Sequence, residues 1–277
     1  MASRWKLWLA LLVSPLCLLQ AQGNRYEELY QEAVRCADAD SLACAEMLFK
    51  EALKLEPSHP GNAMVFSNLG TVQRRMGHDG DALQSYTMAL NLSPLNVPIL
   101  LNRASLYLDM GDEKKAYVDY CNVLDVDHEN AEALLYRAYI YLERRSYAEA
   151  ETDYLRLVRL QPGSILAQMG LATLYQRQKK YRQSLDLFNQ LVSQHPGNAD
   201  LLVARAGLEL EMGQMEVALF DLDSALGLSP SDAGIYVMRG NIYLLKKEKE
   251  LAKSDFEKAI SLGYPRRELH SQLEECR

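Results

Sequence analysis

A period of 34 residues runs through most of the chain and limits the folds open to it. Alanine recurs at this spacing, with Ser184 filling the one gap: Ala82, Ala116, Ala150, Ala218 and Ala252. Four residues after each of these stands a large apolar side chain: Tyr86, Tyr120, Tyr154, Phe188, Leu222 and Phe256. Prolines at 94, 162, 196 and 230 keep the same register, and His128 takes the missing place. A fixed period of this length indicates stacked supersecondary units instead of one globular core.

Each period contains two amphipathic helices. In the segment LYRAYIYLERRSYAEAETDY, residues 135–154, Leu135, Ala138 and Leu142 recur at helical spacing. A second apolar face follows with Ala150 and Tyr154. The proline after the second helix prevents that helix from continuing, so the unit is a helix-turn-helix hairpin.

The pattern resembles the tetratricopeptide repeat family, which has small residues at positions 8 and 20, an aromatic at 24 and proline at 32. Position 8 holds Gly70, Ala104, Ala138, Ala172, Ala206 and Gly240. Six repeats start at Ala63, Val97, Ala131, Ile165, Ala199 and Ala233, and a weaker one starts at Tyr26. The resemblance implies an all-α protein, a right-handed α-solenoid (superhelix) of about seven repeats over residues 23–277. Residues 265–276, with Leu269, Leu273 and Cys276 on one face, are expected to form a C-terminal capping helix.

Position 7 of four repeats places a permanent cation beside the packed face. Wherever it is arginine, position 23 of the same repeat is aspartate: Arg103 and Asp119, Arg137 and Asp153, Arg205 and Asp221, Arg239 and Asp255. The other two full-length repeats carry Leu69 with Ser85 and Leu171 with Leu187. A buried charge is tolerated only when it is paired, so the covariation predicts an ion pair within each of the four hairpins.

The first 22 residues read as an export signal. Arg4 and Lys6 precede an apolar core from Leu7 to Leu19, and Gln20, Ala21 and Gln22 follow. A basic start, a short apolar core and a small-residue exit are typical of a cleaved signal peptide. Cleavage is expected after Ala21 or Gln22, and retention as a membrane anchor is the alternative. No integral membrane segment is expected after signal removal, because no other stretch approaches membrane-spanning length.

Cysteine usage leaves two interpretations open. Cys36 and Cys44 stand on successive helices of the first hairpin and could form a disulfide in an oxidising compartment. The simpler interpretation, which we favour, is that they are buried free thiols that pack as small apolar residues.

Nothing in the sequence indicates catalysis, a cofactor or a metal. The five histidines are scattered without metal-ligand spacing, and no catalytic or nucleotide-binding fingerprint is present. The net charge of −7 argues against nucleic acid as a partner. We therefore expect a protein that is not an enzyme.

The resemblance also implies a binding surface. In this family the first helix of each hairpin, helix A, lines a concave groove, and the second helix is helix B. The helix-A positions that face the groove give candidate peptide-binding residues: Asn68, Thr71, Arg75, Asn102, Ser105, Tyr136, Tyr139 and Met169. Side-chain amides can both donate to and accept from an extended backbone, and tyrosine is enriched at interfaces. The alternative is that Tyr139 only packs against a neighbouring helix and that the asparagines are solvated.

The expected function is a scaffold that binds an extended peptide or a partner protein through the concave groove. The sequence leaves two alternatives: a structural subunit of a cell-envelope complex contacted through convex or edge surfaces, and an accessory module of an envelope enzyme system. The expected location is the periplasm or cell envelope of a bacterium, or the exterior after secretion. The sequence does not define the partner or the oligomeric state.

Overall fold

The local sequence determines where each helix begins. In the computed structural model, which describes residues 15–277, a polar residue just before helix A caps its free N–H groups. The Asn96 side chain accepts a hydrogen bond from the Ile99 amide, and Ser164 and Asn198 do the same for Ala167 and Leu201. The capping residue is the last of the preceding repeat, so it belongs to the same 34-residue pattern.

The turn inside each hairpin requires left-handed backbone. Gly77, Gly111 and Gly213 adopt φ of 76° there. The corresponding place in other hairpins holds a residue with a side chain: Asp40, Arg145, Lys179 and Lys247, with φ between 58° and 64°. L-residues adopt this conformation only at a cost, which glycine avoids.

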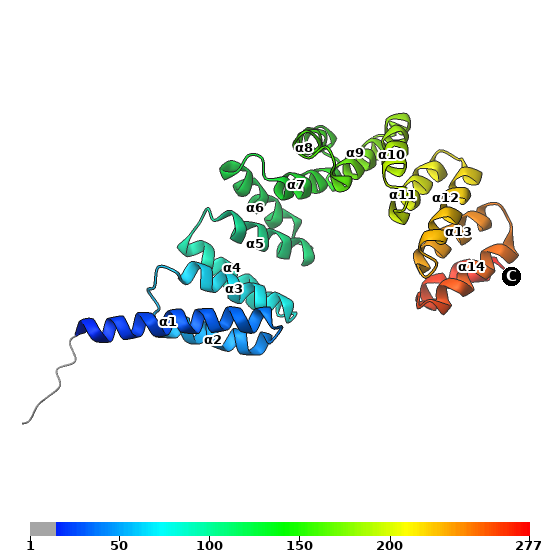
Figure 1. Ribbon diagram of the computed structural model, residues 1–277. Helices are drawn as coiled ribbons and strands as arrows, with labels where there is room; N and C mark the ends of the chain where they lie inside the picture. The colour runs from blue at the N-terminus through cyan, green and yellow to red at the C-terminus, as the bar shows by residue number, and fades with distance from the viewer. Residues whose placement is uncertain (1–14) are drawn as a thin grey trace, which may run out of the picture. The chain divides into compact units, whose positions relative to one another are not determined.

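The chain divides into two compact units, Met1–Ala133 and Leu134–Arg277. The first contains α1 Pro15–Asp38, α2 Leu42–Leu55, α3 Asn62–Arg75, α4 Asp79–Leu92, α5 Val97–Asp109 and α6 Glu113–Val126. The helix α7 Ala131–Glu143 begins at the boundary. It is followed by α8 Tyr147–Leu160, α9 Ile165–Arg177, α10 Tyr181–Gln194, α11 Ala199–Glu211, α12 Met215–Leu228, α13 Ala233–Leu245 and α14 Lys249–Ser261. Within each unit, helices adjacent in sequence lie side by side (Figure 1).

The core is a series of clusters, each of which spans one hairpin and the next helix. The alanines of position 20 and the aromatics of position 24 are almost completely buried, as at Ala82, Tyr86, Ala116 and Tyr120. The cluster around α11 and α12 takes in Ile235 and Ile242 of the following helix α13. A hairpin alone would leave such a face exposed, so neighbouring hairpins complete one another's cores.

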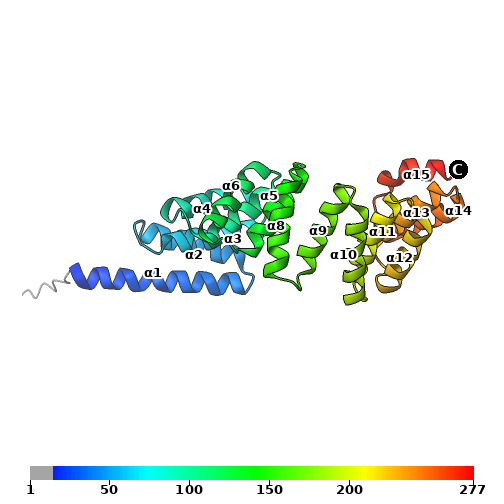
Figure 2. The same ribbon diagram turned by 90° about the horizontal axis from the view of Figure 1, so that it is seen from above.

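The last hairpin is covered by a cap that differs in detail from the predicted single helix. Residues 266–269 form a 3₁₀ turn, η1 Arg266–Leu269, and α15 His270–Glu275 follows directly beside α13 and α14 (Figure 2). Leu269 and Cys276 are buried there against α14, and Leu273 packs beside them. The expected fold class, an all-α solenoid of helical hairpins with a C-terminal cap, is confirmed.

The predicted signal peptide falls mostly outside the described residues. Residues 1–14 are not described, and residues 15–22 belong to the first turns of α1, whose backbone continues into the first repeat. None of the helices in the described part of the chain combines the length and apolar character needed to cross a bilayer. The signal and its cleavage stay predictions.

Candidate functional site

The helix-A surface of the first two hairpins carries two cavities between α1 and α3. One, of about 170 Å³, is lined by Asn68, Thr71 and Arg75 from α3 and by side chains of α1 that include Val34 and Ala37. The other, of about 150 Å³, is lined by residues that include Tyr26, Tyr30, His59 and Met64. Three of the predicted groove residues therefore lie together around a real depression.

Hydrogen bonds between neighbouring hairpins hold these polar groups in place. The Asn68 amide donates to the Tyr30 hydroxyl at 3.1 Å, across the boundary between the two cavities. Arg75 donates to the Ala37 carbonyl at 2.9 Å and to the Asp40 carboxylate at 2.8 Å. Both partners of the second contact are well exposed, so it contributes little stability and chiefly orients the guanidinium.

Two further candidates lie on α5 in the same unit. Asn102 and Ser105 are half-buried. The Ser105 hydroxyl accepts a hydrogen bond at 2.9 Å from Arg74 of α3, which also pairs with Asp109. Ser105 thus helps join two hairpins, whereas Asn102 takes no part in these contacts. The described geometry makes Asn102 the better candidate for contact with a ligand.

The remaining candidates lie in the second unit. Tyr136 and Tyr139 of α7 are exposed, by 37% and 45%. Met169 of α9 is half-buried. Exposed tyrosines on a helix offer apolar contact area with a polar end, as interfaces favour. The role of Tyr136 and Tyr139 as contact residues stays a prediction.

Each of the four predicted ion pairs is present as a two-pronged contact. The guanidinium Nε and Nη2 donate to the two oxygens of one carboxylate, at 2.8 Å each for Arg103 and Asp119. The other three pairs have distances between 2.6 and 2.8 Å. The aspartates are at most 5% exposed. The hydrogen bonds that Arg103, Arg205 and Arg239 donate to the carboxylates raise the pKa of each arginine above its usual value.

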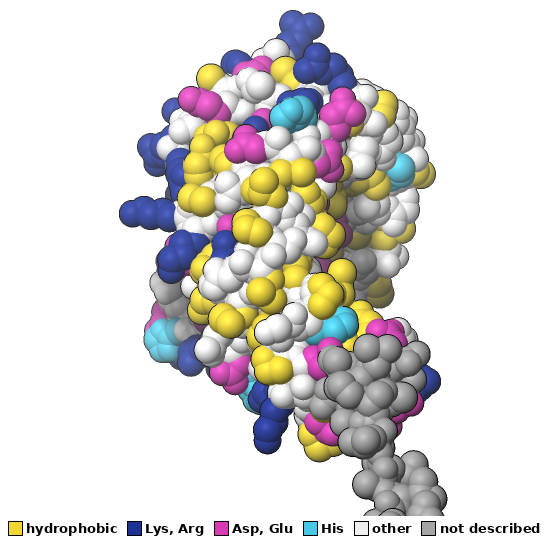
Figure 3. Space-filling view, turned by 90° about the vertical axis from the view of Figure 1, so that its left-hand side faces the viewer, with side chains coloured by type: hydrophobic (Ala, Val, Ile, Leu, Met, Phe, Trp, Pro, Cys, Tyr) yellow, Lys and Arg dark blue, Asp and Glu magenta, His cyan; other side chains and the backbone are white. Residues whose placement is uncertain are grey.

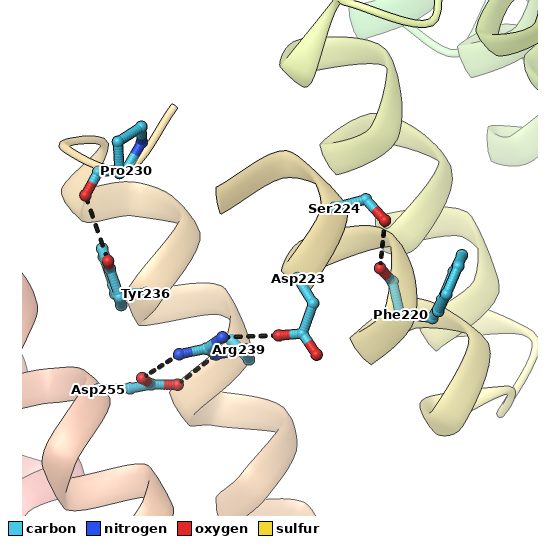
Figure 4. A network of polar contacts seen from close by, with 7 residues as sticks. All are labelled: Phe220, Asp223, Ser224, Pro230, Tyr236, Arg239 and Asp255. Atoms are coloured by element: carbon cyan, nitrogen blue, oxygen red, sulfur yellow. Dashed lines mark hydrogen bonds and ion pairs between the residues drawn. The ribbon is translucent and has the colours of Figure 1, made fainter. Parts of the chain in front are cut away.

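A third partner, which sequence reasoning missed, extends the contact to the preceding repeat. Arg239 Nη1 donates to Asp223 of α12 at 2.6 Å while its other nitrogens hold Asp255 of α14 (Figure 4). Arg205 reaches Asn189 and Arg103 reaches Thr87 in the same way. In these three repeats the third partner stands sixteen residues before the arginine, at position 25. This spacing was readable from the sequence, but its residue type varies.

The two repeats with leucine at position 7 have other side chains in place of the arginine, the aspartate and the third partner. Leu171 and Leu187 belong to one apolar cluster, and the position that corresponds to the third partner holds Leu155, so all three positions are apolar. In the repeat that starts at Ala63, Ser85 instead donates to Gln73 at 2.6 Å, and Gln73 donates to Glu46 at 3.1 Å. Lys50 completes this chain by pairing with Glu46 at 2.7 Å.

Glu209 is a buried carboxyl at position 11, where most other repeats have tyrosine. It is 4% exposed, its Oε1 lies 3.9 Å from Arg205 Nε, and its Oε2 has no hydrogen-bond partner among the described residues. Burial and the nearby Asp221 raise the pKa of Glu209 to about 7. The sequence signal was the departure from tyrosine, which alone did not indicate a titratable core group.

Gly170 marks a further feature that sequence reasoning missed. A side chain at this position would meet the Tyr154 ring at 2.3 Å, so only glycine lets α8 and α9 pack as they do. Asn68, Asn102 and Tyr136 occupy the same repeat position elsewhere. The helix-A surface is therefore interrupted at this repeat, next to Met169.

The cysteines and possible metal ligands add no further chemistry. Cys36 and Cys44 are free thiols in the structure, and a hydrogen bond between the Cys36 thiol and Cys44 raises the pKa of Cys36. The first hairpin thus packs without a disulfide. Over residues 15–277 no three His, Cys, Asp or Glu side chains cluster in a way that could hold a metal ion.

Comparisons with known proteins identify the repeat. Family models described as tetratricopeptide repeat match residues 101–165, 169–233 and 233–262. A crystal structure of a tetratricopeptide repeat protein from Parabacteroides merdae ATCC 43184 has 37% sequence identity and a TM-score of 0.81, and the match covers 91% of this chain and 99% of that chain. A search of curated proteins gave no match.

More distant structures share the fold alone. A chain of the APC/C hetero-tetramer Cut9-Hcn1 is 14% identical with a TM-score of 0.64, over 94% of this chain and 55% of that chain. MamA from Desulfovibrio magneticus RS-1 is 17% identical with a TM-score of 0.50, over 60% of this chain and 94% of that chain.

The fold and the helix-A surface define a helical-repeat protein of the class that presents extended surfaces to other proteins. The chain belongs to the tetratricopeptide repeat family. Repeats of this family form scaffolds for protein–protein interaction and are generally without catalytic activity of their own.

Proposed function

We propose that this protein is a non-catalytic scaffold that binds an extended peptide segment of a partner protein on the helix-A surface of its repeats. The observation that carries the proposal is the pair of cavities between α1 and α3, where fixed polar groups stand beside apolar walls. Asn68 and Arg75 are already oriented by neighbouring hairpins, so a ligand would not have to order them.

Asn102 and the α7 tyrosines extend the proposed contact set beyond the cavities. An asparagine amide can bond both the N–H and the C=O of an extended chain, which gives affinity without sequence specificity. Tyr136 and Tyr139 add apolar contact area in their own unit. Each unit is proposed to contribute its own contacts.

The proposal is tested by capturing partners from cell extract on the immobilised full-length chain. We expect Asn102→Ala and Tyr136→Ala to reduce recovery of a specific partner at least tenfold, a loss of about 1.4 kcal/mol of binding free energy. Val118→Ala, on the exposed outer face of α6, is the matched control and should recover the partner normally. If Asn102→Ala and Tyr136→Ala both recover the same proteins as the unaltered chain, the proposed peptide binding on the helix-A surface fails.

A structural subunit of a larger complex is the second candidate, and one observation favours it. On α12 and α14, Phe220 is 71% exposed, with Val217 and Leu251 exposed by 47% and 49%. The Phe220 ring carries none of the polar contacts drawn around Arg239 in Figure 4. If Phe220→Ser abolishes partner recovery while the groove variants do not, this function replaces the first.

Export to the cell envelope is a further part of the proposal, supported by the N-terminal sequence alone. Producing the full-length chain in a Gram-negative host and fractionating the cells tests it. A periplasmic product that begins after Ala21 or Gln22 is the expected result, and an intact cytoplasmic chain would contradict it.

A further inference from the structure

An open groove of about 450 Å³ lies on the other side of the first unit, between α2 and α4 and above α3. Its apolar lining consists of Leu53 from α2, Phe66 and Leu69 from α3, and Met88 from α4. It is larger than either cavity on the helix-A surface. Figure 3 shows hydrophobic side chains that reach the surface of the molecule between charged ones.

The groove exists because the usual filling residue is missing. In four repeats an arginine pairs with its own aspartate at this place, and Arg103 also reaches Thr87 in the second helix of the preceding repeat. The equivalent places here hold Leu69, Ser85 and Lys50. Leucine is shorter than arginine and Ser85 turns inward to Gln73, so the groove stays open to solvent.

The charged side chains that line the groove differ from those of the ionic repeats. Where the four ionic repeats place a carboxylate, this one has Ser85. The α2 wall of the groove carries Lys50 and Lys54, and the α4 wall carries Asp81. Lys50 is paired with Glu46, whereas Lys54 is exposed and has no ion-pair partner among the described residues. A ligand that brings a carboxylate to this wall would form an ion pair with Lys54 next to an apolar lining.

We propose that this groove, defined by α2, α3 and α4, binds an amphipathic helix of a partner protein with acidic residues along the border of its apolar face. Two roughly parallel helices with an apolar floor accept a third helix through anchors at i, i+3 or i+4. The helices α2 and α4 have 14 residues each, which gives about 21 Å of wall, enough for four turns of the ligand. Acidic residues on the side facing α2 would meet Lys54.

The test uses a phage-displayed library of random 16-residue peptides selected on the full-length chain. We expect selected peptides to carry apolar residues at helical spacing and net negative charge, and to gain helical circular dichroism on binding. Lys54→Glu and Met88→Glu, both at exposed positions, should each weaken binding at least tenfold.

The chain itself supplies a matched variant that closes the groove. The triple substitution Lys50→Thr, Leu69→Arg and Ser85→Asp installs the set found at Thr87, Arg103 and Asp119, so its folding has a precedent in the next repeat. It should keep the helical signal and lose the peptides. Asn102→Ala on the helix-A surface should leave the affinity for the selected peptides within twofold, which separates this proposal from peptide binding on the helix-A surface.

Four results would overturn the proposal. These are a library that yields no binder, peptides that are basic, peptides that bind the triple variant and Met88→Glu as well as the unaltered chain, and dimerisation of the free chain that the triple variant abolishes. The last would assign the groove to a second copy of this chain.

Discussion

At the scale of single residues, the arginines at position 7 connect three helices through hydrogen bonds. Arg239 contacts its own helix α13, Asp255 of α14 and Asp223 of α12. Burying such a charge is costly unless every donor is used, and here the carboxylate and the third partner use them. The repeats with Leu171 and Leu187 show that an apolar set fits the same position.

This comparison predicts that removing one partner is harmful and removing both is tolerated. Asp119→Leu should lower the free energy of unfolding by about 3 kcal/mol, because Arg103 keeps its buried charge without the carboxylate. Adding Arg103→Leu should restore stability to within about 1 kcal/mol of the unaltered chain. Urea unfolding of the three proteins checks this, and a double variant as unstable as the single one would contradict it.

Glu209 predicts a pH dependence of stability. Its pKa in the folded protein, about 7, lies above that of an ordinary glutamate, so the folded state holds a proton that the unfolded chain releases. The stability this group contributes is complete below about pH 4.5 and is lost as pH rises through 7. The loss is up to about 3 kcal/mol.

The measurement is the unfolding free energy at pH 5 and pH 8. The unaltered chain should be destabilised at pH 8 relative to Glu209→Gln, which cannot ionise but keeps the size of the side chain. Parallel pH profiles for the two proteins would show that Glu209 does not titrate in the folded state near neutrality.

At the scale of helices, boundaries depend on a few turn residues. The period predicts hairpins, but the cost of each turn depends on whether glycine stands at the left-handed position. Lys179 adopts φ of 59° there, while Gly213 holds the same place in the next hairpin with φ of 76°.

Lys179→Gly should therefore stabilise the protein by about 0.5–1 kcal/mol, since relief of left-handed strain exceeds the extra entropy of glycine in the unfolded chain. The opposite exchange, Gly213→Lys, should destabilise it by a similar amount. Thermal unfolding of both variants measures the two shifts, and shifts of the same sign would refute the explanation.

At the scale of the whole chain, the sequence predicts the fold far better than the binding surfaces. The hairpins are encoded many times over, because the alanine, the aromatic and the proline recur in most of the repeats. The ion pairs were predictable for the same reason, since the repeats could be compared with one another. Seven copies of one pattern leave little ambiguity about how helices alternate.

The surfaces were less predictable because they depend on which side chains are already occupied. Asn68 and Ser105 face the expected surface, yet both are bonded to neighbouring hairpins. The groove between α2 and α4 results from three residues in different helices that differ from those of the ionic repeats, and no periodic pattern describes this combination. Such combinations become visible only when the packed neighbours are known.

The central claim is that hairpins complete one another's cores as nearest neighbours. Amide hydrogen exchange on the chain truncated after Ser231, which lacks the last hairpin and cap, tests it most directly. Loss of Ile235 and Ile242 from the α11–α12 cluster should speed exchange in α11 and α12 at least tenfold and leave α3 and α4 unchanged within twofold. Equal loss of protection in α3 and α4 would instead indicate one indivisible core and contradict the account.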